Sequence, residues 1–311
     1  MKGAGVWPDW YNFLMITTID EALVRGLLPE RPENGHKGCF GSALISAGSQ
    51  HYTGAALLAG GACLRSGVGL TYMAIPEAIY PALAGQVPEA IWELQPSCEG
   101  SFAAAAAENL EGLLRKKDAW LIGPGLGLSE ATRDFFEALF KRVLPGLEQV
   151  PPTIIDADGL RLLSGMTDWP GLLPRHAVLT PHPGEMAALS GLTVEAIQAE
   201  RGEIARRYAQ AWGVTLVLKG AFTVVASPDG ELRVLPYASS ALAHGGSGDV
   251  LAGLICGLLA QGMEAFAAAT LGVWLHAKAS QFALRRIGHA AAVLPVDLVM
   301  EFGKAMRSLG W

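Results

Sequence analysis

Cysteine is scarce in this sequence and is not clustered. The four cysteines among its 311 residues form no Cys-x-x-Cys pair; they are Cys39, Cys63, Cys98 and Cys256. A zinc site or a disulfide framework would need closer or more regular spacing. We therefore expect reduced thiols and a cytoplasmic protein.

Long apolar runs and an excess of positive charge are also missing. The longest apolar runs are interrupted by glycine and are shorter than a membrane span. The first twenty residues contain Asp9 and Asn12 and no basic leader, which is unlike a signal peptide. The net charge of -6 gives no reason to expect nucleic-acid binding. The sequence predicts a soluble protein that binds neither membranes nor nucleic acid.

Several common catalytic signatures are absent. The sequence has no GxxxxGK[ST], GxSxG or HExxH motif, which excludes P-loop enzymes, serine hydrolases of the GxSxG type and common zinc peptidases. A GPGLG turn at residues 123–127 lacks the GxGxxG spacing of dinucleotide-binding folds. Taken alone, this turn is weak evidence, because glycine turns after strands are common in α/β folds.

Hydrophobic residues make up 51% of the chain and charged residues only 17%, which suits one large, well-buried domain. Units of strand, loop and helix recur about six times without a linker, which predicts a single-domain α/β fold with a doubly wound, mostly parallel sheet flanked by helices. Residues 1–35 are predicted to be a lead with a short helix near 18–27, and residues 36–311 to be the domain. The predicted strands are 42–47, 70–75, 120–122, 153–155, 176–179, 215–218, 223–226 and 232–235, and the longer helices before the glycine loop are 53–65, 101–116, 129–142 and 194–212.

The sequence AHGGSGDVLAG at residues 243–253 is the most informative stretch. Adjacent glycines allow positive φ and a close approach of the backbone to a ligand. The apolar residues that follow repeat at helical spacing, so a helix begins here and presents free N–H groups to an anion such as phosphate. Asp249 is either a first-turn acid that favours the helix dipole or a base that takes a proton from an attacking hydroxyl.

Ligands of open α/β sheets bind at the carboxyl ends of strands. Four loops at predicted strand ends carry unusual residues: 123–127, 180–185, 219–223 and 244–249. His182, between two prolines, either points at a ligand or lies on the surface. Lys219 closes an apolar strand and either has an anionic partner or extends to solvent. Asp156 and Asp158 could hold Mg²⁺ through water, but capping of the next helix is favoured.

Taken together, these loops resemble those of the ADP- or ATP-dependent NAD(P)H-hydrate dehydratases, members of the ribokinase-like superfamily. The matching motifs are HKGCFG, YTGAALLAGGACLRSGVGL, LIGPGLG, IIDADGL, LTPHPGE, VLKGAFTVV and GGSGDVLAGLICGLLAQG, which occur in this order and cover about residues 18–305. GGSGD alone indicates only the superfamily. The order of HKG, TPHPGE and KGAFT separates the dehydratases from the related kinases.

The resemblance implies repair of damaged NADH or NADPH. The (S)-hydrates, NADHX and NADPHX, would be phosphorylated on the ring hydroxyl by ADP or ATP with Mg²⁺, and phosphate would then leave to restore the reduced ring. Asp249 would be the base, and the amides of Gly246, Ser247 and Gly248 would form the anion hole. The implied nucleotide contacts are Lys219, Gly220, Ala221, Phe222, Thr223 and Gly248, and the implied hydrate contacts are Ala43, Gly125, His182 and Asp249. No metal ligand is assigned, and a homo-oligomer is expected.

The chain departs from the family pattern at two places. Ser239-Ser240-Ala241 replaces the usual Asn-Pro-Gly, which bears on nucleotide affinity or preference, and Gly159-Leu160-Arg161 replaces Ala-Leu-Asn. Many bacterial relatives carry an epimerase domain in front, whereas only about 35 residues precede His36 here, too few for a domain. Epimerisation is therefore expected to need another chain.

Two other functions use the same glycine loop. One is a small-molecule kinase that acts on a vitamin precursor, and the other is a non-catalytic nucleotide sensor. The reaction product separates them from the dehydratase, because a kinase releases a stable phosphate ester and a sensor releases nothing. Only the dehydratase returns the reduced-ring chromophore.

Overall fold

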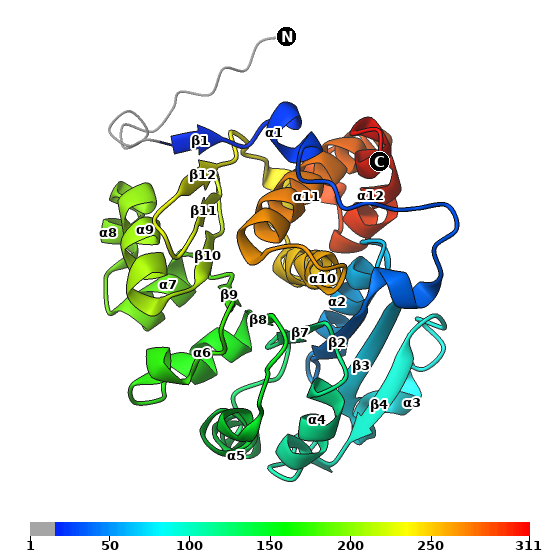
Figure 1. Ribbon diagram of the computed structural model, residues 1–311, viewed down its shortest axis with the longest axis vertical. Coiled ribbons are helices and arrows are strands. Elements are labelled where there is room, and N and C mark those ends of the chain that lie inside the picture. Colours follow the sequence, from blue (N-terminus) through cyan, green and yellow to red (C-terminus); the bar gives the residue numbers. More distant parts are fainter. Residues whose placement is uncertain (1–15) are drawn as a thin grey trace.

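The computed structural model describes residues 16–311 (Figure 1). Within these residues, ten strands form one sheet in the order β1-β12-β11-β10-β9-β8-β7-β2-β3-β4. The first fifteen residues of the predicted lead lie outside the described part. The strands are β1 (Ile16–Thr18), β2 (Ser42–Ser46), β3 (Leu70–Pro76), β4 (Ile91–Gln95), β7 (Ala119–Ile122), β8 (Thr153–Ile155), β9 (Val178–Leu179), β10 (Thr215–Leu218), β11 (Val224–Ala226) and β12 (Leu232–Val234).

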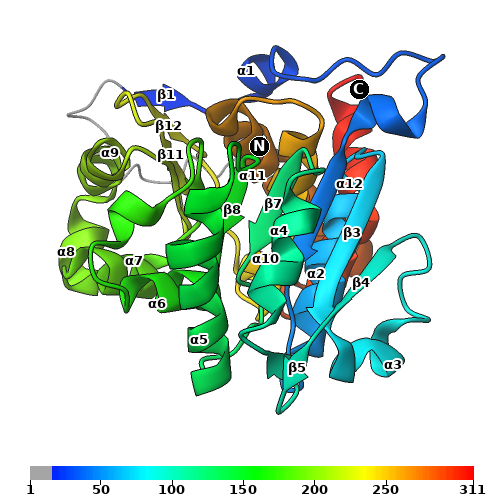
Figure 2. The ribbon, with the colours of Figure 1, turned by 60° about the horizontal axis from the view of Figure 1, so that its bottom comes forward.

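Nearly all neighbouring strands are parallel. The exception is β11, which runs antiparallel to both β10 and β12 and forms a hairpin with β12. β1, inside the predicted lead, pairs in parallel with β12 at one end of the sheet. At the other end β2, β3 and β4 run side by side, as Figure 2 shows. The prediction of a mostly parallel α/β sheet is confirmed.

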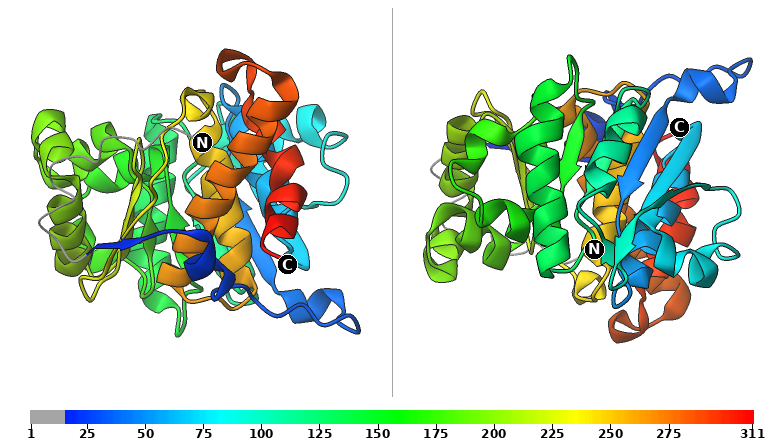
Figure 3. Two further views of the ribbon diagram at one scale, coloured as in Figure 1. Left: turned by 90° about the horizontal axis from the view of Figure 1, so that it is seen from above. Right: turned by 90° about the horizontal axis from the view of Figure 1, so that it is seen from below.

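Helices cover both faces of the sheet (Figures 1 and 3). One face packs against α2 (Thr53–Leu64), α10 (Ser247–Ala260), α11 (Ala265–Ile287) and α12 (Pro295–Ser308), and the other against α4 (Ala106–Leu114), α5 (Glu130–Ala138), α6 (Asp158–Ser164), α7 (Pro183–Ser190) and α9 (Arg201–Trp212). Strand side chains alternate between the two cores, as the pleat requires. On β2, Ala43 and Ile45 enter the first core and Leu44 enters the second.

Helix α10 sits unusually close to α2. A side chain at Gly253 would collide with the backbone carbonyl of Ala59 in α2, and one at Gly257 would collide with Ser66. These glycines let the two backbones approach, which is why the apolar stretch after the glycine loop is rich in small residues. The packing fixes where α10 begins, and therefore where Asp249 is presented.

Four predicted elements differ in detail. The helix predicted at 101–116 starts only at Ala106, because Ser101–Phe102 forms strand β6, which pairs with β5 (Ser97–Cys98). The helix predicted at 194–212 is broken at Glu200, whose non-helical backbone separates α8 (Val194–Ala199) from α9. Helix α2 ends at Leu64, one residue before the predicted end. The first helix, α1 (Glu21–Arg25), is shorter than predicted and is capped by Asp20.

No helix within residues 16–311 combines the length and the apolar composition that a bilayer span requires.

Candidate functional site

Four parallel strands end side by side at one edge of the sheet. Strands β7, β8, β9 and β10 are consecutive neighbours in parallel register, so the loops that follow them share this edge. Backbone hydrogen bonds between neighbouring segments continue past the strand ends. The Thr180 N–H donates to the Ile155 carbonyl (3.3 Å), and the Lys219 N–H donates to the Pro181 carbonyl (2.9 Å). The loops are therefore held by the sheet, which gives a site the rigidity that precise chemistry needs.

A buried ion pair joins two of these loops. Lys219 Nζ lies 2.6 Å from Asp156 Oδ1 and 3.8 Å from Glu185 Oε2. Asp156 is fully buried, and Glu185 is 5% exposed. Burial alone would lower the pKa of Lys219, but the negative charges of Asp156 and Glu185 outweigh it and raise the pKa above its usual value. Lys219 thus has the anionic partner that its position at the end of an apolar strand requires.

The glycine loop meets this ammonium group directly. A Cβ atom added to Gly248 would lie 3.2 Å from Lys219 Nζ and 3.8 Å from Asp156 Oδ2. Gly246 has a φ of 95° and precedes the first residue of α10, Ser247. The Ser247 N–H donates to the His244 carbonyl at 3.2 Å. The positive end of the α10 dipole and the cation beside Gly248 together suit a phosphate group. Ser247 Oγ also lies 3.3 Å from Nε2 of the buried His276, which ties the loop to α11.

Asp249 lies in the first turn of α10 and is partly buried. Burial, followed by the negative charge of Asp156, raises its pKa to about 7, although Lys219 opposes the shift. A carboxylate that titrates near neutral pH is suited to accept a proton and release it again. An exposed acid in the first turn of a helix would lack the burial and the neighbouring carboxylate that raise the pKa of Asp249.

His182 and Glu185 cap the start of α7 together. His182 Nδ1 accepts the N–H groups of Gly184 (3.0 Å) and Glu185 (3.2 Å), while Glu185 Oε2 accepts the His182 N–H (2.8 Å). Because Nδ1 is an acceptor, the neutral ring carries its proton on Nε2. Burial, followed by the charge of Lys219, lowers the pKa of His182, and burial raises the pKa of Glu185 to about 7.

Three further predicted site residues, Gly125, Phe222 and Ala43, do not all lie at this edge of the sheet. Gly125 (φ 65°) packs at this edge, where a Cβ atom would come within 2.8 Å of Tyr52 Cβ. Phe222, in the 219–223 loop, also has positive φ (56°). Ala43 is not brought together with them. It is fully buried on β2 near the amino end of that strand, opposite the site. Its contact with the hydrate stays a prediction.

The favoured interpretation of Asp156 and Asp158 as helix caps is wrong. The residue before α6 is Ala157, and no side chain caps that helix. Asp158 Oδ2 instead accepts the Gly127 N–H at 2.9 Å, and Asp156 binds Lys219. Both carboxylates therefore join strand-end loops. At the first departure from the family pattern, Ser239 Oγ accepts the Ala241 N–H at 3.2 Å and closes a 3₁₀ turn, Ser240–Leu242.

Two charged residues of the site were not among the predicted site residues. Glu185 could have been found, because an acid three residues after a capping residue is a helix-start signature. For Asp156 the sequence predicts only a helix cap or a magnesium ligand. Its ion pair with Lys219 joins residues that are 63 positions apart in the sequence. Sequence patterns carry no information about such a distant pair.

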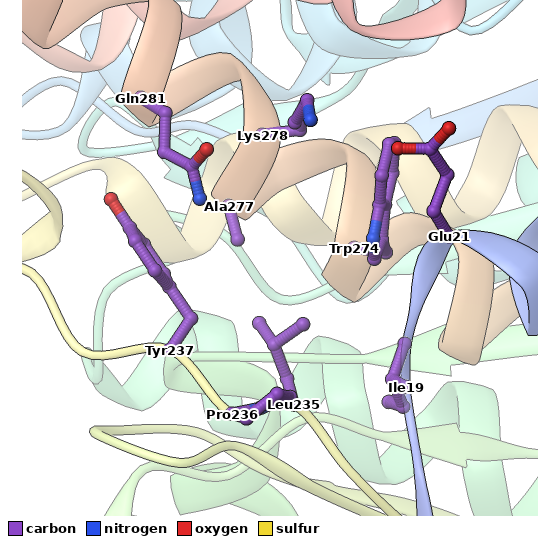
Figure 4. Close-up of a pocket in the computed structure, with 9 residues that line it drawn as sticks. All are labelled: Ile19, Glu21, Leu235, Pro236, Tyr237, Trp274, Ala277, Lys278 and Gln281. Carbon is purple, nitrogen blue, oxygen red and sulfur yellow. The ribbon is translucent and has the colours of Figure 1, made fainter. Parts of the chain in front are cut away.

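A cavity of about 170 Å³ lies beside the site and contains none of its predicted residues (Figure 4). It is open to solvent and is lined by the chain after β1, the chain after β12 and one side of α11; the lining includes Glu21, Leu235, Tyr237, Trp274, Lys278 and Gln281. The Tyr237 carbonyl accepts the Phe222 N–H at 3.1 Å, and its hydroxyl lies 2.9 Å from Ser280 Oγ. Tyr237 therefore separates the cavity from the 219–223 loop.

The sequence is similar to those of known NAD(P)H-hydrate repair proteins. Residues 43–302 match the family model of the NAD(P)H-hydrate dehydratases. The chain is 42% identical over 291 residues to the bifunctional NAD(P)H-hydrate repair enzyme of Moorella thermoacetica, covering 93% of this chain and 53% of that protein. It therefore spans about half the length of this relative. It is 35% identical to the ADP-dependent (S)-NAD(P)H-hydrate dehydratase of Neisseria meningitidis, covering 86% of each.

Solved structures give the same fold. The ADP/ATP-dependent NAD(P)H-hydrate dehydratase of Bacillus subtilis, co-crystallised with ATP and Mg²⁺, is similar with a TM-score of 0.80 and 30% identity, covering 95% of this chain and 99% of that chain. A ribokinase-like superfamily protein of Enterococcus faecalis has a TM-score of 0.80 at 24% identity and covers 98% of each chain. The prediction of a ribokinase-like fold is thus confirmed.

Proposed function

The chain belongs to the NAD(P)H-hydrate dehydratase family, and we propose that it dehydrates (S)-NADHX and (S)-NADPHX to NADH and NADPH. ADP or ATP would be the phosphoryl donor. The observation that carries the proposal is the position of Asp249, a carboxylate with a pKa of about 7 in the first turn of α10, next to the Gly248 amide and the ammonium of Lys219. The resemblance inferred from the motifs is borne out by the family match.

In the first step, the ring hydroxyl of the hydrate attacks the terminal phosphorus of the nucleotide. Asp249 takes the hydroxyl proton, and the bond to the AMP or ADP leaving group breaks. The amides of Gly246, Ser247 and Gly248 form the anion hole for the transferring phosphoryl group. Free carboxylate is needed at this point, and a pKa of about 7 leaves a substantial fraction of Asp249 ionised at neutral pH.

In the second step, the phosphate ester eliminates. Hydroxide is a poor leaving group at neutral pH, whereas phosphate leaves readily when the ring nitrogen lone pair pushes it out. Loss of a proton from the adjacent ring carbon then restores the dihydronicotinamide. The products are NADH or NADPH, inorganic phosphate and the nucleotide shortened by one phosphate.

We assign the nucleotide to the loop formed by Lys219, Gly220, Ala221, Phe222 and Thr223, together with Gly248. The hydrate is assigned to the side of His182 and Gly125, with Asp249 between the two substrates. His182 Nδ1 is already used as a cap, so Nε2–H is the ring group that can donate to the hydrate, although it lies 3.4 Å from Glu185 Oε1.

The residues present fit Mg²⁺ that arrives with the nucleotide. No group of three or more His, Cys, Asp or Glu side chains within residues 16–311 is arranged to hold a metal ion. Asp156 Oδ2, however, is buried without a hydrogen-bond partner and could serve as one carboxylate ligand. Mg²⁺ in nucleotide enzymes is commonly held by one or two carboxylates and by phosphates. Bound there, it would neutralise phosphate charge.

The protein is also proposed to be cytoplasmic and to form a homo-oligomer. Four free cysteines, two of them exposed, favour the reducing cytoplasm. A homo-oligomer is supported by exposed apolar side chains around the start of α12, namely Leu294, Val296 and Met300. Light scattering of the purified chain would give its mass in solution, and a monomer at all concentrations would contradict this part of the proposal.

The activity is tested with purified protein, (S)-NADHX and a panel of nucleotides with Mg²⁺, following recovery of the reduced-ring absorbance. Stoichiometric release of inorganic phosphate with recovery of the chromophore is expected. Accumulation of a stable phosphate ester would instead indicate a kinase. Nucleotide binding without turnover of any hydrate would indicate a sensor.

A further inference from the structure

A buried arginine lies directly behind the 219–223 loop. Arg201, the first residue of α9, is only 5% exposed. Its Nη2 donates to the carbonyls of Leu218 (2.8 Å) and Lys219 (3.2 Å), and its Nη1 donates to Gln198 Oε1 (2.8 Å). The guanidinium thus binds two backbone carbonyls at the point where β10 ends and the 219–223 loop begins.

The charge of Arg201 has no counter-ion in the described part of the chain. No carboxylate within residues 16–311 lies within 4.0 Å of its guanidinium, and its Nε atom is buried without a hydrogen-bond partner. Burying an unpaired cation is unfavourable, and here burial lowers the pKa of the group to about 10. A leucine or methionine could fill the same space without this penalty, so the charge calls for a functional reason.

The loop backbone lies against the guanidinium with no side chain between them. Gly220 has a φ of 138°, and a Cβ atom placed on it would lie 3.3 Å from Arg201 Nη2 and 3.4 Å from Nη1. A trans peptide points its N–H opposite to its carbonyl. Because the Lys219 carbonyl turns toward Arg201, the N–H of Gly220 points to the other side. α9 and α10 pack on opposite faces of the sheet, so that other side is the side of α10.

We propose that Arg201 is a positioning residue for the nucleotide. By holding the Leu218 and Lys219 carbonyls, it aims the Gly220 N–H toward the α10 side of the loop, where the proposed nucleotide phosphates bind. The negative charge of those phosphates then offsets the unpaired charge of Arg201 from the opposite side of the loop. The inference rests on the nucleotide-binding part of the proposed function and is independent of whether a hydrate is dehydrated.

Calorimetric titration of the full chain with ADP and with ATP, each with Mg²⁺, tests this role in four proteins. Arg201→Met removes the positive charge and the hydrogen bonds to the Leu218 and Lys219 carbonyls. Arg201→Lys keeps the charge but lacks the planar guanidinium. Gln198→Ala removes one hydrogen-bond partner of Arg201 from an exposed position. Arg207→Met is the control, because Arg207 is an exposed arginine of the same helix. Thermal melting of each variant reports whether it is folded.

The expected result is selective for the nucleotide. Arg201→Met should weaken nucleotide binding about tenfold or more, Arg201→Lys should recover part of the loss, and Gln198→Ala should weaken binding about twofold to threefold, since hydrogen bonds to charged groups are among the stronger ones. The KM for the hydrate should stay within about twofold of the wild-type value, and Arg207→Met should match wild type.

Two outcomes would overturn the inference. One is wild-type nucleotide affinity in folded Arg201→Met; if that variant does not fold, wild-type affinity in both Arg201→Lys and Gln198→Ala has the same meaning. The other is an equal rise in the KM values for hydrate and nucleotide, which would indicate a general structural role. A wild-type chain that binds nucleotide but restores no reduced ring would contradict the dehydratase and leave the role of Arg201 standing.

Discussion

Lys219 Nζ lies 2.6 Å from Asp156 Oδ1, in a pair that joins the ends of two parallel strands beneath the glycine loop. The same ammonium is the nearest neighbour that a side chain at Gly248 would meet. The pair therefore places one positive charge beside the start of α10 and one negative charge close enough to raise the pKa of Asp249. Asp156 thus shapes the site although none of its atoms is exposed.

Removal of Asp156 should destabilise the fold. Asp156→Ala leaves Lys219 buried without its closest partner, and breaking a buried pair in this way costs about 3–5 kcal/mol. Chemical denaturation at pH 7 measures the loss. Glu203→Gln is the matched control, because it breaks the exposed pair between Glu203 and Arg206, which should contribute less than about 1 kcal/mol. Equal effects of the two changes would contradict the importance given to the buried pair.

Asp249→Asn should abolish most turnover while nucleotide binding persists. The amide cannot accept the hydroxyl proton, and loss of a positioned base lowers kcat by about two to four orders of magnitude. Initial rates of chromophore recovery and calorimetric nucleotide titration measure the two effects separately. Turnover near the wild-type rate would remove Asp249 from the role of base.

The rate should rise with pH through the neutral range. The base acts only when ionised, and its pKa of about 7 means that kcat/KM should fall about tenfold per pH unit well below pH 6 and level off above pH 8. The pKa of Glu185 is also about 7, so Glu185 titrates in the same pH range. A profile that is flat between pH 5 and pH 8 would contradict the electrostatic setting of Asp249.

Stability should change in the opposite direction with pH. Asp249 and Glu185 have raised pKa values in the folded state, so between about pH 4 and pH 7 the folded chain binds more protons than the unfolded chain. The free energy of unfolding therefore decreases as pH rises through this window. Asp249→Asn should reduce the slope and melt at a higher temperature than wild type at pH 8. A lower melting temperature of Asp249→Asn at pH 8 would show that burial of the ionised Asp249 carboxylate does not destabilise the fold.

The two roles of His182 can be separated by two substitutions. His182→Ala removes both the proposed contact with the hydrate and the cap of α7, so it should raise the KM for the hydrate and destabilise the fold by about 1 kcal/mol. His182→Asn keeps a capping side chain and should lose only the first function. Kinetics with varied hydrate and varied nucleotide distinguish the substrates. An effect on the nucleotide KM alone would place His182 at the wrong substrate.

Much of the fold and part of the site could be predicted from the sequence. The apolar spacing after Ser247 determined that a helix begins there, and the apolar stretches before Asp156 and Lys219 marked two strands whose loops meet at one edge. Because glycine turns, apolar periodicity and motif order are properties of short segments, they remain visible without the tertiary structure. The order of those motifs was enough to identify the family.

Only the tertiary structure decided how these segments meet. The pairing of Lys219 with Asp156, the role of His182 as a helix cap, the burial of Ala43 at the far end of its strand and the position of Arg201 behind Gly220 all depend on which strands are neighbours. The pKa of Asp249 depends on them as well, since burial and distant charges set it. Strand order and packing bring together residues far apart in sequence, and no local pattern records those distances.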